Sequence, residues 1–272
     1  MKDIIDFTKQ KARNIRELVL RSLTEAGSGH LGGSMDLADI FSVLYFNEMK
    51  YDINNTLWEN RDRLVLSIGH TAPVLYATLA EAGFYPKEET LTLRKFGSRL
   101  QGHPSKDFRL PGVETSAGSL GQGLGIAIGI AISAKMDDKD FRTYCVMGDG
   151  ELQEGSVWEA AMAASNYRLD NLCAIIDRNR LQIDGATENV MALEPLYDKW
   201  SSFGWNVVEI DGHDHKDIVD AFSVARATKG QPTLILANTI MGKGVKCIEN
   251  DNKWHGKVPS REQLTDFIDN LY

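Results

Sequence analysis

The sequence predicts an α/β protein in which a parallel sheet of five to six strands is covered by helices on both faces. Five short apolar runs alternate with segments of helical periodicity, a pattern typical of parallel strands buried between two helical layers. No linker rich in proline, glycine or serine, no low-complexity segment and no internal repeat interrupts the 272 residues. We therefore expect a single domain over residues 1–272.

The expected elements follow from these periodicities. Strands are expected where apolar runs stop at glycine or polar residues, at 62–67, 144–147, 172–176, 205–210 and 233–237. Helices are expected at 8–25, 36–46, 73–82, 123–136, 157–167, 193–203, 217–229 and 260–271. The glycine-rich stretch 27–33 is expected to be irregular, with Ser34 as the N-cap of the next helix. Residues 94–115 show little periodicity, and loops this long inside a domain are usually functional.

Charge and cysteine content exclude several classes of partner. A net charge of -8 argues against nucleic acid or an anionic membrane as the main partner, although it does not exclude phosphorylated substrates. Cys145, Cys173 and Cys247 form no CxxC pair, and two of them fall in expected strands, so we expect reduced thiols and a cytoplasmic protein. The first residues do not resemble a signal peptide, and the longest uncharged apolar segment, 124–134, is too short to span a bilayer.

Residues 143–185 form one predicted β–α–β unit that carries polar residues at both strand ends. Asp149 and Asn179, thirty residues apart, should meet at the carboxyl edge of the sheet, where open α/β folds bind ligands. Gly148 and Gly150 would let a phosphate approach the backbone. A carboxylate, an amide oxygen, a backbone carbonyl and phosphate oxygens suit Mg²⁺, with Ca²⁺ or Mn²⁺ as alternatives. For a lone Gly-Asp-Gly, a simple turn with a capping asparagine is the commoner interpretation, but the pairing favours a ligand site.

Histidines are the second group of candidate functional residues. His30, His70, His103 and His255 each stand beside glycine or proline in an expected loop. One such histidine is more often a surface or packing residue, whereas four together indicate a site that transfers protons near neutral pH. A further pair, His213 and His215, lies at a strand-to-helix junction, where turn and cap residues are more common than metal ligands.

Two glycine motifs do not match the nucleotide-binding patterns that they superficially suggest. Residues 121–125, Gly-Gln-Gly-Leu-Gly, follow no expected strand and lack the acidic residue of a dinucleotide-binding fingerprint. Residues 241–244, Met-Gly-Lys-Gly, lack the earlier glycine of a P-loop. We therefore do not expect a nucleotide site at either motif.

Seven motifs in the same order resemble transketolases over about residues 10–260. They are SGH, GH after the first strand, GHP, GSLGQG, GDGELQEG, the strand end RN-x-x-x-IDG, and TIMGKG with WHGK. The resemblance implies the diphosphate-binding module of the thiamine diphosphate-binding fold, with thiamine diphosphate and a divalent cation as cofactors. It also implies transfer of a two-carbon ketol unit from a ketose phosphate to an aldose phosphate.

The resemblance implies roles for individual residues. Asp149, Asn179 and the carbonyl of Leu181 would hold the divalent ion. The residues implied to contact the cofactor are His70, Gly118, Ser119, Leu120, Asp149, Gly150, Asn179, Ile183 and His255. His30, His103 and His255 would bind sugar hydroxyls and move protons. Glu154 and Glu159 would join an acidic relay between two cofactors, although such glutamates are also typical of a solvated helix start.

Two positions depart from the family pattern. Ser119 stands where the loop usually has proline, which loosens the backbone. Arg178 precedes the expected metal ligand Asn179 and brings a positive charge next to it, for which the sequence offers no explanation.

A full transketolase is more than twice as long as this chain, so a partner is expected. The resemblance covers neither the pyrimidine-binding domain, with the glutamate that protonates the aminopyrimidine, nor the C-terminal domain. We hypothesise an N-terminal subunit that acts with a separate C-terminal subunit carrying the pyrimidine-binding domain, as an α2β2 heterotetramer. The alternatives are half of a specialised ketol-transferase such as one for apulose 4-phosphate, half of a 1-deoxyxylulose 5-phosphate synthase-like enzyme, or a non-catalytic thiamine diphosphate-binding subunit.

Overall fold

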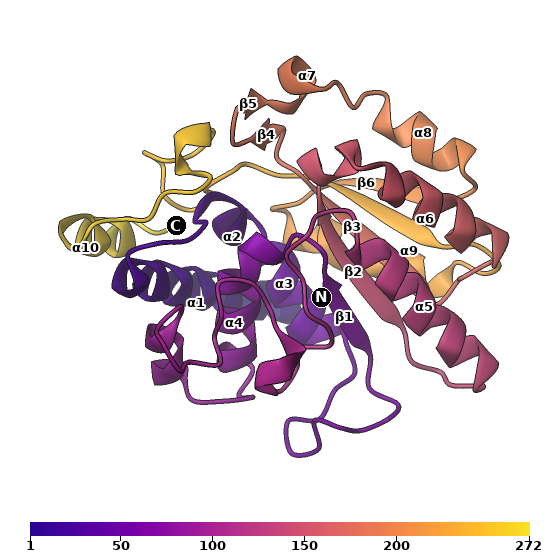
Figure 1. The fold of residues 1–272 in the computed structure, drawn as a ribbon, viewed down its shortest axis with the longest axis horizontal. Coiled ribbons are helices and arrows are strands. Elements are labelled where there is room, and N and C mark those ends of the chain that lie inside the picture. The colour runs from indigo at the N-terminus through magenta and orange to yellow at the C-terminus, as the bar shows by residue number, and fades with distance from the viewer.

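The computed structural model describes all residues, Met1–Tyr272, and its centre is a five-stranded parallel sheet (Figure 1). The strands, in their order across the sheet, are β1 (Arg63–Leu66), β2 (Thr143–Gly148), β3 (Leu172–Arg178), β7 (Thr233–Asn238) and β6 (Asn206–Asp211). All five expected strands form, and the α/β prediction is confirmed. Because all strands run in the same direction, their carboxyl ends share one edge of the sheet.

Helices cover both faces of the sheet (Figure 1). The helices over one face are α1 (Lys2–Ala26), α3 (Ala38–Val43), α4 (Ala72–Glu81) and α9 (His215–Ala227). Those over the other are α5 (Gly123–Met136), α6 (Gly155–Asn166) and α8 (Leu196–Ser202). The remaining helices are α2 (Gly32–Asp36), α7 (Thr187–Val190), α10 (Arg261–Asp269), a π-helical turn at Leu44–Glu48, and short 3₁₀ helices at Gly69–Thr71, Lys87–Thr92, Lys106–Phe108, Gly150–Gln153 and Asn252–Trp254.

Strand alternation separates the two hydrophobic cores. Tyr144 and Val146 of β2 pack into the core beneath α1, α3 and α4, whereas Cys145 and Met147 pack into the core beneath α5 and α6. Cys173 of β3 belongs to the first of these cores, so Cys145 and Cys173 lie on opposite faces and cannot pair. All three cysteines are free thiols, as expected.

The segment after the first helix differs from the prediction. Gly32 and Gly33, expected in an irregular loop, begin α2, and Ser34 does not cap a helix but donates from Oγ to the His30 carbonyl at 2.8 Å. Close packing explains the glycines, because a Cβ on Gly32 would lie 2.7 Å from Cγ of Met241. Tertiary contact therefore outweighs the low helix propensity of glycine here.

Other helix ends follow local signals in the sequence. Asp214 caps α9 by accepting from the backbone N–H groups of Lys216 and Asp217, and Ser260 forms a capping box with Gln263 at the start of α10. The long segment 94–115 is irregular apart from one 3₁₀ turn, as predicted. No helix combines the length and the apolar composition that crossing a bilayer requires.

The sequence did not predict the hairpin beyond β3. Strands β4 (Leu181–Gln182) and β5 (Gly185–Ala186) pair antiparallel and lead directly into α7. Figure 1 shows the hairpin and α7 at one end of the sheet, apart from the helices packed on its faces. Strands of two residues are too short to leave a periodic signal.

Candidate active site

A cavity of about 280 Å³ lies at the carboxyl edge of the sheet, where β2 and β3 end. Its walls come from six separate parts of the chain: Gly33 in α2, the turn after β1, Leu120 in the loop before α5, the Gly-Asp-Gly turn after β2, the segment from the end of β3 into the β4–β5 hairpin, and His255. The predicted site residues that line it are His70, Leu120, Asp149, Gly150, Glu154, Asn179, Leu181, Ile183 and His255. Residues as far apart in sequence as His70 and His255 therefore share one site.

The other predicted site residues lie around this cavity. The ring centroid of His30 is 4.9 Å from that of His70 and 5.6 Å from that of His255, so these three histidines form one cluster. His103 lies beside the exposed Gly118, where an added Cβ would be 3.8 Å from the imidazole ring. Ser119 is exposed next to Gly118. Glu159 is exposed on α6 and does not line the cavity, so the structure brings only Glu154 to it.

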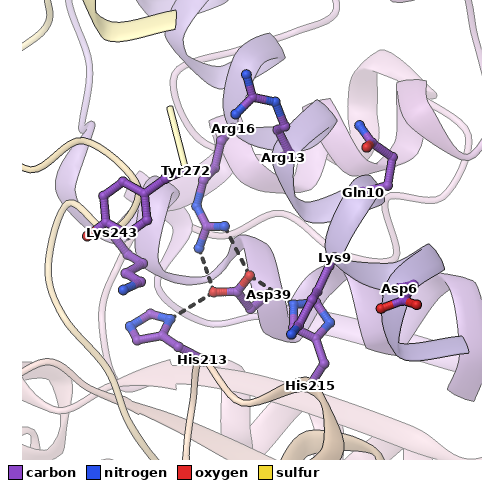
Figure 2. A pocket seen from close by; sticks show the side chains of 10 residues that line it. All are labelled: Asp6, Lys9, Gln10, Arg13, Arg16, Asp39, His213, His215, Lys243 and Tyr272. Carbon is purple, nitrogen blue, oxygen red and sulfur yellow. Dashed lines mark hydrogen bonds and ion pairs between the residues drawn. The ribbon is translucent and has the colours of Figure 1, made fainter. Parts of the chain in front are cut away.

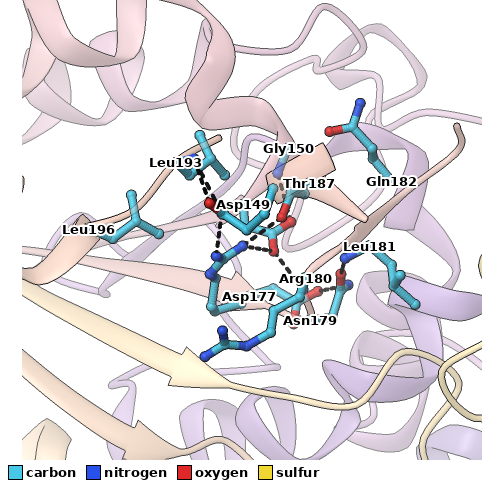
Figure 3. Close-up of polar contacts among 12 residues, drawn as sticks. Asp149, Gly150, Asp177, Asn179, Arg180, Leu181, Gln182, Thr187, Leu193 and Leu196 are labelled. Carbon is cyan, nitrogen blue, oxygen red and sulfur yellow. Dashed lines mark hydrogen bonds and ion pairs between the residues drawn. The ribbon is translucent and has the colours of Figure 1, made fainter. Parts of the chain in front are cut away.

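Asp149 is held by donors on both of its oxygens (Figure 3). Its Oδ1 accepts from the Gly150 N–H at 2.7 Å, and its Oδ2 accepts from the Arg180 N–H at 2.7 Å and from Nη1 of Arg178 at 2.9 Å. Burial nevertheless keeps the pKa of Asp149 above its ordinary value, although Arg178 and these backbone donors oppose that rise. These donors thus fix the orientation of the carboxylate, but they do not fully offset the cost of burying its negative charge.

Asn179 is oriented by two buried carboxylates that the sequence did not single out. Its Nδ2 donates to Asp36 and to Asp177, both at 3.1 Å, while its Oδ1 accepts from the Leu181 N–H at 3.0 Å. Because the carboxylates take the amide nitrogen, the amide oxygen is left on the side of Leu181. Burial raises the pKa of Asp177 to about 7, with Asp149 adding to that rise, and burial together with Asp177 raises the pKa of Asp36 well above its usual range.

These donors fit a hard divalent cation that shares its coordination with a phosphate ligand. Asp149 has a carboxylate, Asn179 an amide oxygen and Leu181 a backbone carbonyl, and all three residues line the cavity. No group of three or more histidine, cysteine or acidic side chains is arranged so that it could hold a metal ion by itself. Mg²⁺ is typically bound in this way, through one or two carboxylates together with phosphate oxygens.

The histidine cluster is neutral and incompletely hydrogen-bonded. Burial, reinforced by the neighbouring histidines, lowers the pKa of His30 to about 4 and that of His70 to about 3. Burial also lowers the pKa values of His103 and His255. The Nδ1 atoms of His30 and His255 are buried without a hydrogen-bond partner. Such atoms need a polar ligand or water, so this end of the cavity fits a molecule rich in hydrogen-bonding groups.

Glu151 connects the two glycine loops and was missed in the sequence. Its buried carboxylate accepts from Oγ of Ser67, from the Gly121 N–H at 2.7 Å and from the Gly148 N–H at 3.3 Å. Gly121 has a φ of +82°, and an added Cβ would lie 2.7 Å from Cβ of Glu154, so only glycine fits there. The one signal in the sequence was the acidic residue directly after Gly-Asp-Gly, which is equally typical of a solvated helix start.

A second hollow, of about 460 Å³, contains His213 and His215 (Figure 2). Figure 2 shows that both histidines point at Asp39, which accepts from Nδ1 of His213 at 2.8 Å and from Nε2 of His215 at 3.1 Å. The other ring nitrogen of His213 accepts from the Ile240 N–H at 2.8 Å, and that of His215 is 2.8 Å from Oγ1 of Thr8. With both ring nitrogens engaged, neither histidine has a free lone pair for a metal. His213 lies in the turn before α9 and His215 begins that helix, while the cap is Asp214.

Comparison with known proteins identifies the family. The model for "transketolase, thiamine diphosphate binding domain" matches residues 7–267. The chain belongs to the transketolase family. It is 45% identical to one subunit of the apulose-4-phosphate transketolase from Phocaeicola vulgatus, an alignment that covers 95% of this chain and 91% of that relative. It is 46% identical to 6-deoxy-6-sulfo-D-fructose transketolase subunit SqwG from a Clostridium species, covering 95% of this chain and 93% of the relative.

Longer transketolases share the same fold over part of their length. Transketolase from Homo sapiens is 42% identical, and the alignment covers 97% of this chain but 42% of the human protein. The crystal structure of transketolase from Campylobacter jejuni superposes with a TM-score of 0.90 at 34% identity, covering 97% of this chain and 42% of that one. The chain therefore spans about two-fifths of full-length transketolases and nearly all of the two shorter relatives.

These relationships confirm the family, the fold and the class of enzyme. The chain is the N-terminal, thiamine diphosphate-binding part of a transketolase, a transferase, and its relatives of similar length are named as single subunits, which implies a partner subunit. The cavity residues fit thiamine diphosphate, because its diphosphate could share a divalent cation with the oxygen atoms of Asp149 and Asn179.

Proposed function

We propose that this subunit binds thiamine diphosphate through a divalent cation held by Asp149, Asn179 and the Leu181 carbonyl, and that it catalyses transfer of a two-carbon ketol unit from a ketose phosphate to an aldose phosphate. Mg²⁺ is the expected ion, with Ca²⁺ or Mn²⁺ as alternatives. The observation that carries the proposal is the convergence of these three oxygen donors and the histidine cluster on one cavity.

The residues around the cavity have different proposed roles in holding the cofactor. When bound, thiamine diphosphate supplies a nucleophilic carbon suited to carrying a ketol unit. Gly150, His70 and His255 would contact the diphosphate. Ile183, whose side chain is 63% exposed, would be covered by the cofactor, as would Leu120.

Sugar binding and proton transfer fall to the remaining histidines. His30, His103 and His255 would bind sugar hydroxyls. The lowered pKa values leave these imidazoles neutral at pH 7, so each ring can donate a hydrogen bond from one nitrogen and accept one at the other. Gly118 and Ser119, which are exposed, would contact the cofactor.

Helix α5 supports an assembly of more than one chain. It is apolar all round, which is typical of a buried helix, yet Gly125, Ile126 and Gly129 are exposed. An added Cβ at Gly125 or Gly129 would meet nothing within 4 Å, and Met162 on the neighbouring α6 is 54% exposed. We propose that this face is a subunit contact in an α2β2 heterotetramer.

Two further features fit this assembly. Glu154 and Glu159, both exposed near the start of α6, would lie by the contact and form the acidic relay between cofactors. We also propose that residues 1–272 act as a single diphosphate-binding domain, with the pyrimidine-binding domain supplied by the partner. We also propose a cytoplasmic location, with which three free cysteines are compatible.

The activity is tested by mixing this subunit with a candidate partner that carries a pyrimidine-binding domain, such as the product of a neighbouring gene. Ketol transfer from xylulose 5-phosphate to ribose 5-phosphate is measured with Mg²⁺ and thiamine diphosphate. We expect activity in the mixture and none with either chain alone. Ketol transfer by the isolated chain would contradict the proposal. So would a mixture that forms a stable complex but transfers no ketol unit from any donor sugar tested.

The assembly is tested by Ile126→Glu, which places a charge on the exposed face of α5. Because Ile126 is 39% exposed in this chain, we expect the isolated subunit to fold normally. The dissociation constant of the assembly should rise by at least about 10-fold. Light scattering of the mixed subunits measures the effect. Glu209→Gln, on the edge strand β6, serves as a control that should leave assembly intact.

A specialised ketol-transferase is the second candidate. The two relatives that match this chain over most of their own length are named for apulose-4-phosphate and for 6-deoxy-6-sulfo-D-fructose. A panel of ketose donors, including these two, assayed with the reconstituted complex separates the candidates by their kcat/KM values.

A further inference from the structure

Arg178 is a buried arginine directly before the proposed cation ligand Asn179, and its side chain is only 1% exposed. It does not line the cavity but lies behind Asp149. Its Nη1 donates to Oδ2 of Asp149 at 2.9 Å and to Oγ1 of Thr187 at 2.8 Å. The positive charge that the sequence left unexplained is thus directed at the proposed cation ligand and away from the ligand space.

The other end of the guanidinium holds the segment 187–194. Nη2 of Arg178 donates to Glu188 at 2.8 Å and to Glu194 at 2.9 Å. Glu188 also accepts from the Leu193 N–H at 3.2 Å, and Glu194 accepts from the Leu196 N–H at 2.8 Å. One side chain therefore connects Asp149 to both ends of a segment that follows the cavity-lining hairpin.

Charge balance distinguishes this arrangement from a simple ion pair. An arginine beside a carboxylate that must bind a cation would weaken that binding by repulsion. Here one guanidinium faces three carboxylates, those of Asp149, Glu188 and Glu194, so the group as a whole is negative. The two glutamates offset the arginine charge, while the arginine still orients Asp149.

We propose that Arg178 is a positioning residue for the cation site, and that it couples cation binding to the ordering of residues 187–194. This inference rests on the proposed cation at Asp149. Locking the segment holds the Asp149 carboxylate in one orientation, and a bound cation in turn fixes Asp149 against Arg178. Partners of metal ligands that do not touch the metal typically contribute 10–100-fold in affinity.

The test compares Mn²⁺ binding, measured by electron paramagnetic resonance in the presence of thiamine diphosphate, in the assembled complex. We expect Arg178→Met to weaken Mn²⁺ binding by about 10–100-fold, and Arg178→Lys to recover part of the loss because an ammonium can still reach Asp149. Unchanged or tighter binding in a folded Arg178→Met protein would overturn the inference, because it would mean that the arginine only stabilises the fold or only repels the cation.

Failure of the underlying cation site looks different. If the wild-type complex binds no Mn²⁺ with thiamine diphosphate, both the proposed cation site and this inference fall. If the wild type binds Mn²⁺ and Asp149→Asn abolishes binding, the cation site stands, and the Arg178 variants alone decide the inference.

A second variant covers the case in which Arg178→Met does not fold. The side chains of Glu188 and Glu194 are 35% and 46% exposed, so the double change Glu188→Gln and Glu194→Gln should leave the fold intact. We expect weaker Mn²⁺ binding and loss of the protection from hydrogen exchange that Mg²⁺ and thiamine diphosphate confer on residues 187–194 in the wild type. Glu59→Gln is the matched control, because its side chain is 82% exposed and it is distant in sequence from Glu188 and Glu194. Wild-type affinity and wild-type protection in the double variant would overturn the coupling.

Discussion

Two buried aspartates, Asp39 and Asp149, show how the same side chain serves structure in one region and a ligand site in another. Both are almost fully buried and both contact an arginine. Asp39 accepts from Arg16, His213 and His215, all of them side chains (Figure 2). Asp149 accepts from one arginine and two backbone N–H groups beside an open cavity (Figure 3).

The two carboxylates differ in how completely their charge is compensated. Burial alone would raise the pKa of Asp39, but Arg16 and the two histidines hold it well below its ordinary value. At Asp149 burial prevails over Arg178, and the pKa stays raised. Asp39 is therefore a closed cluster that needs no further ligand, whereas Asp149 keeps the capacity to bind a cation. The difference lies in the side chains that donate to each carboxylate, an arginine and two imidazoles at Asp39 against one arginine at Asp149, rather than in burial.

The largest expected effect comes from Asp149→Asn. Replacing the carboxylate with a neutral amide should lower ketol transfer by at least about 100-fold, because the cation loses its one carboxylate ligand. The fold should survive, since the variant removes a buried charge whose pKa burial has raised. Activity of the complex and unfolding of the cofactor-free chain are measured in parallel. Activity near the wild-type level would contradict the metal assignment.

Asp39→Asn should show the opposite pattern. It leaves the buried Arg16 without its charged partner, which typically costs about 3–5 kcal/mol of unfolding free energy. Urea unfolding measures the loss, and the Mn²⁺ affinity of the remaining folded protein should not change. Asp220→Asn, which removes an exposed pair with Lys216, is the control and should cost about 0–1 kcal/mol. Equal losses of unfolding free energy in Asp39→Asn and Asp220→Asn would contradict this prediction, because the buried cluster would then contribute no more than the exposed pair.

The pH dependence of stability gives a third expected effect. The pKa of His70 is about 3 in the folded chain, against an ordinary value of 6.5. As the pH falls below 6.5, the unfolded chain takes up the proton first, so stability should fall between pH 6.5 and about 3, with a slope approaching about 1.4 kcal/mol per pH unit. His70→Gln should flatten this part of the curve for the cofactor-free chain. An identical acid limb in wild type and variant would refute the assignment.

Local patterns predicted the strands and the ends of several helices. The five apolar runs of the sheet and the irregular segment 94–115 depend on residues adjacent in the chain, and so do the Asp214 and Ser260 caps, although these two caps were not predicted. Ser34 failed as a cap because contact between Gly32 and Met241, more than two hundred residues away, extends the helix. Propensity is a weak guide wherever such long-range packing decides the backbone.

The candidate site was predicted in its parts but not in its supports. Asp149 and Asn179 were found because parallel strands must end at a common edge, and the histidines because their loops resemble those of a known family. Three side chains that hold these residues were missed: Asp36, Glu151 and Asp177. Each resembles an ordinary turn, cap or surface residue when seen in sequence alone. Arg178 was noticed as a departure from the family pattern, but its contact with Asp149 was not predicted.

The sequence by itself determined the fold class, the family and the residues proposed to face the ligand, because periodicity and motifs depend on neighbours along the chain. Only the tertiary structure decided which charges are buried and which partners compensate them. Asp39 and Asp149 are the same residue type in the printed sequence. Their distances to donors from other segments leave Asp39 fully paired within the structure and Asp149 able to bind the proposed cation. Electrostatic energy depends on burial and on separation in space, and sequence separation specifies neither.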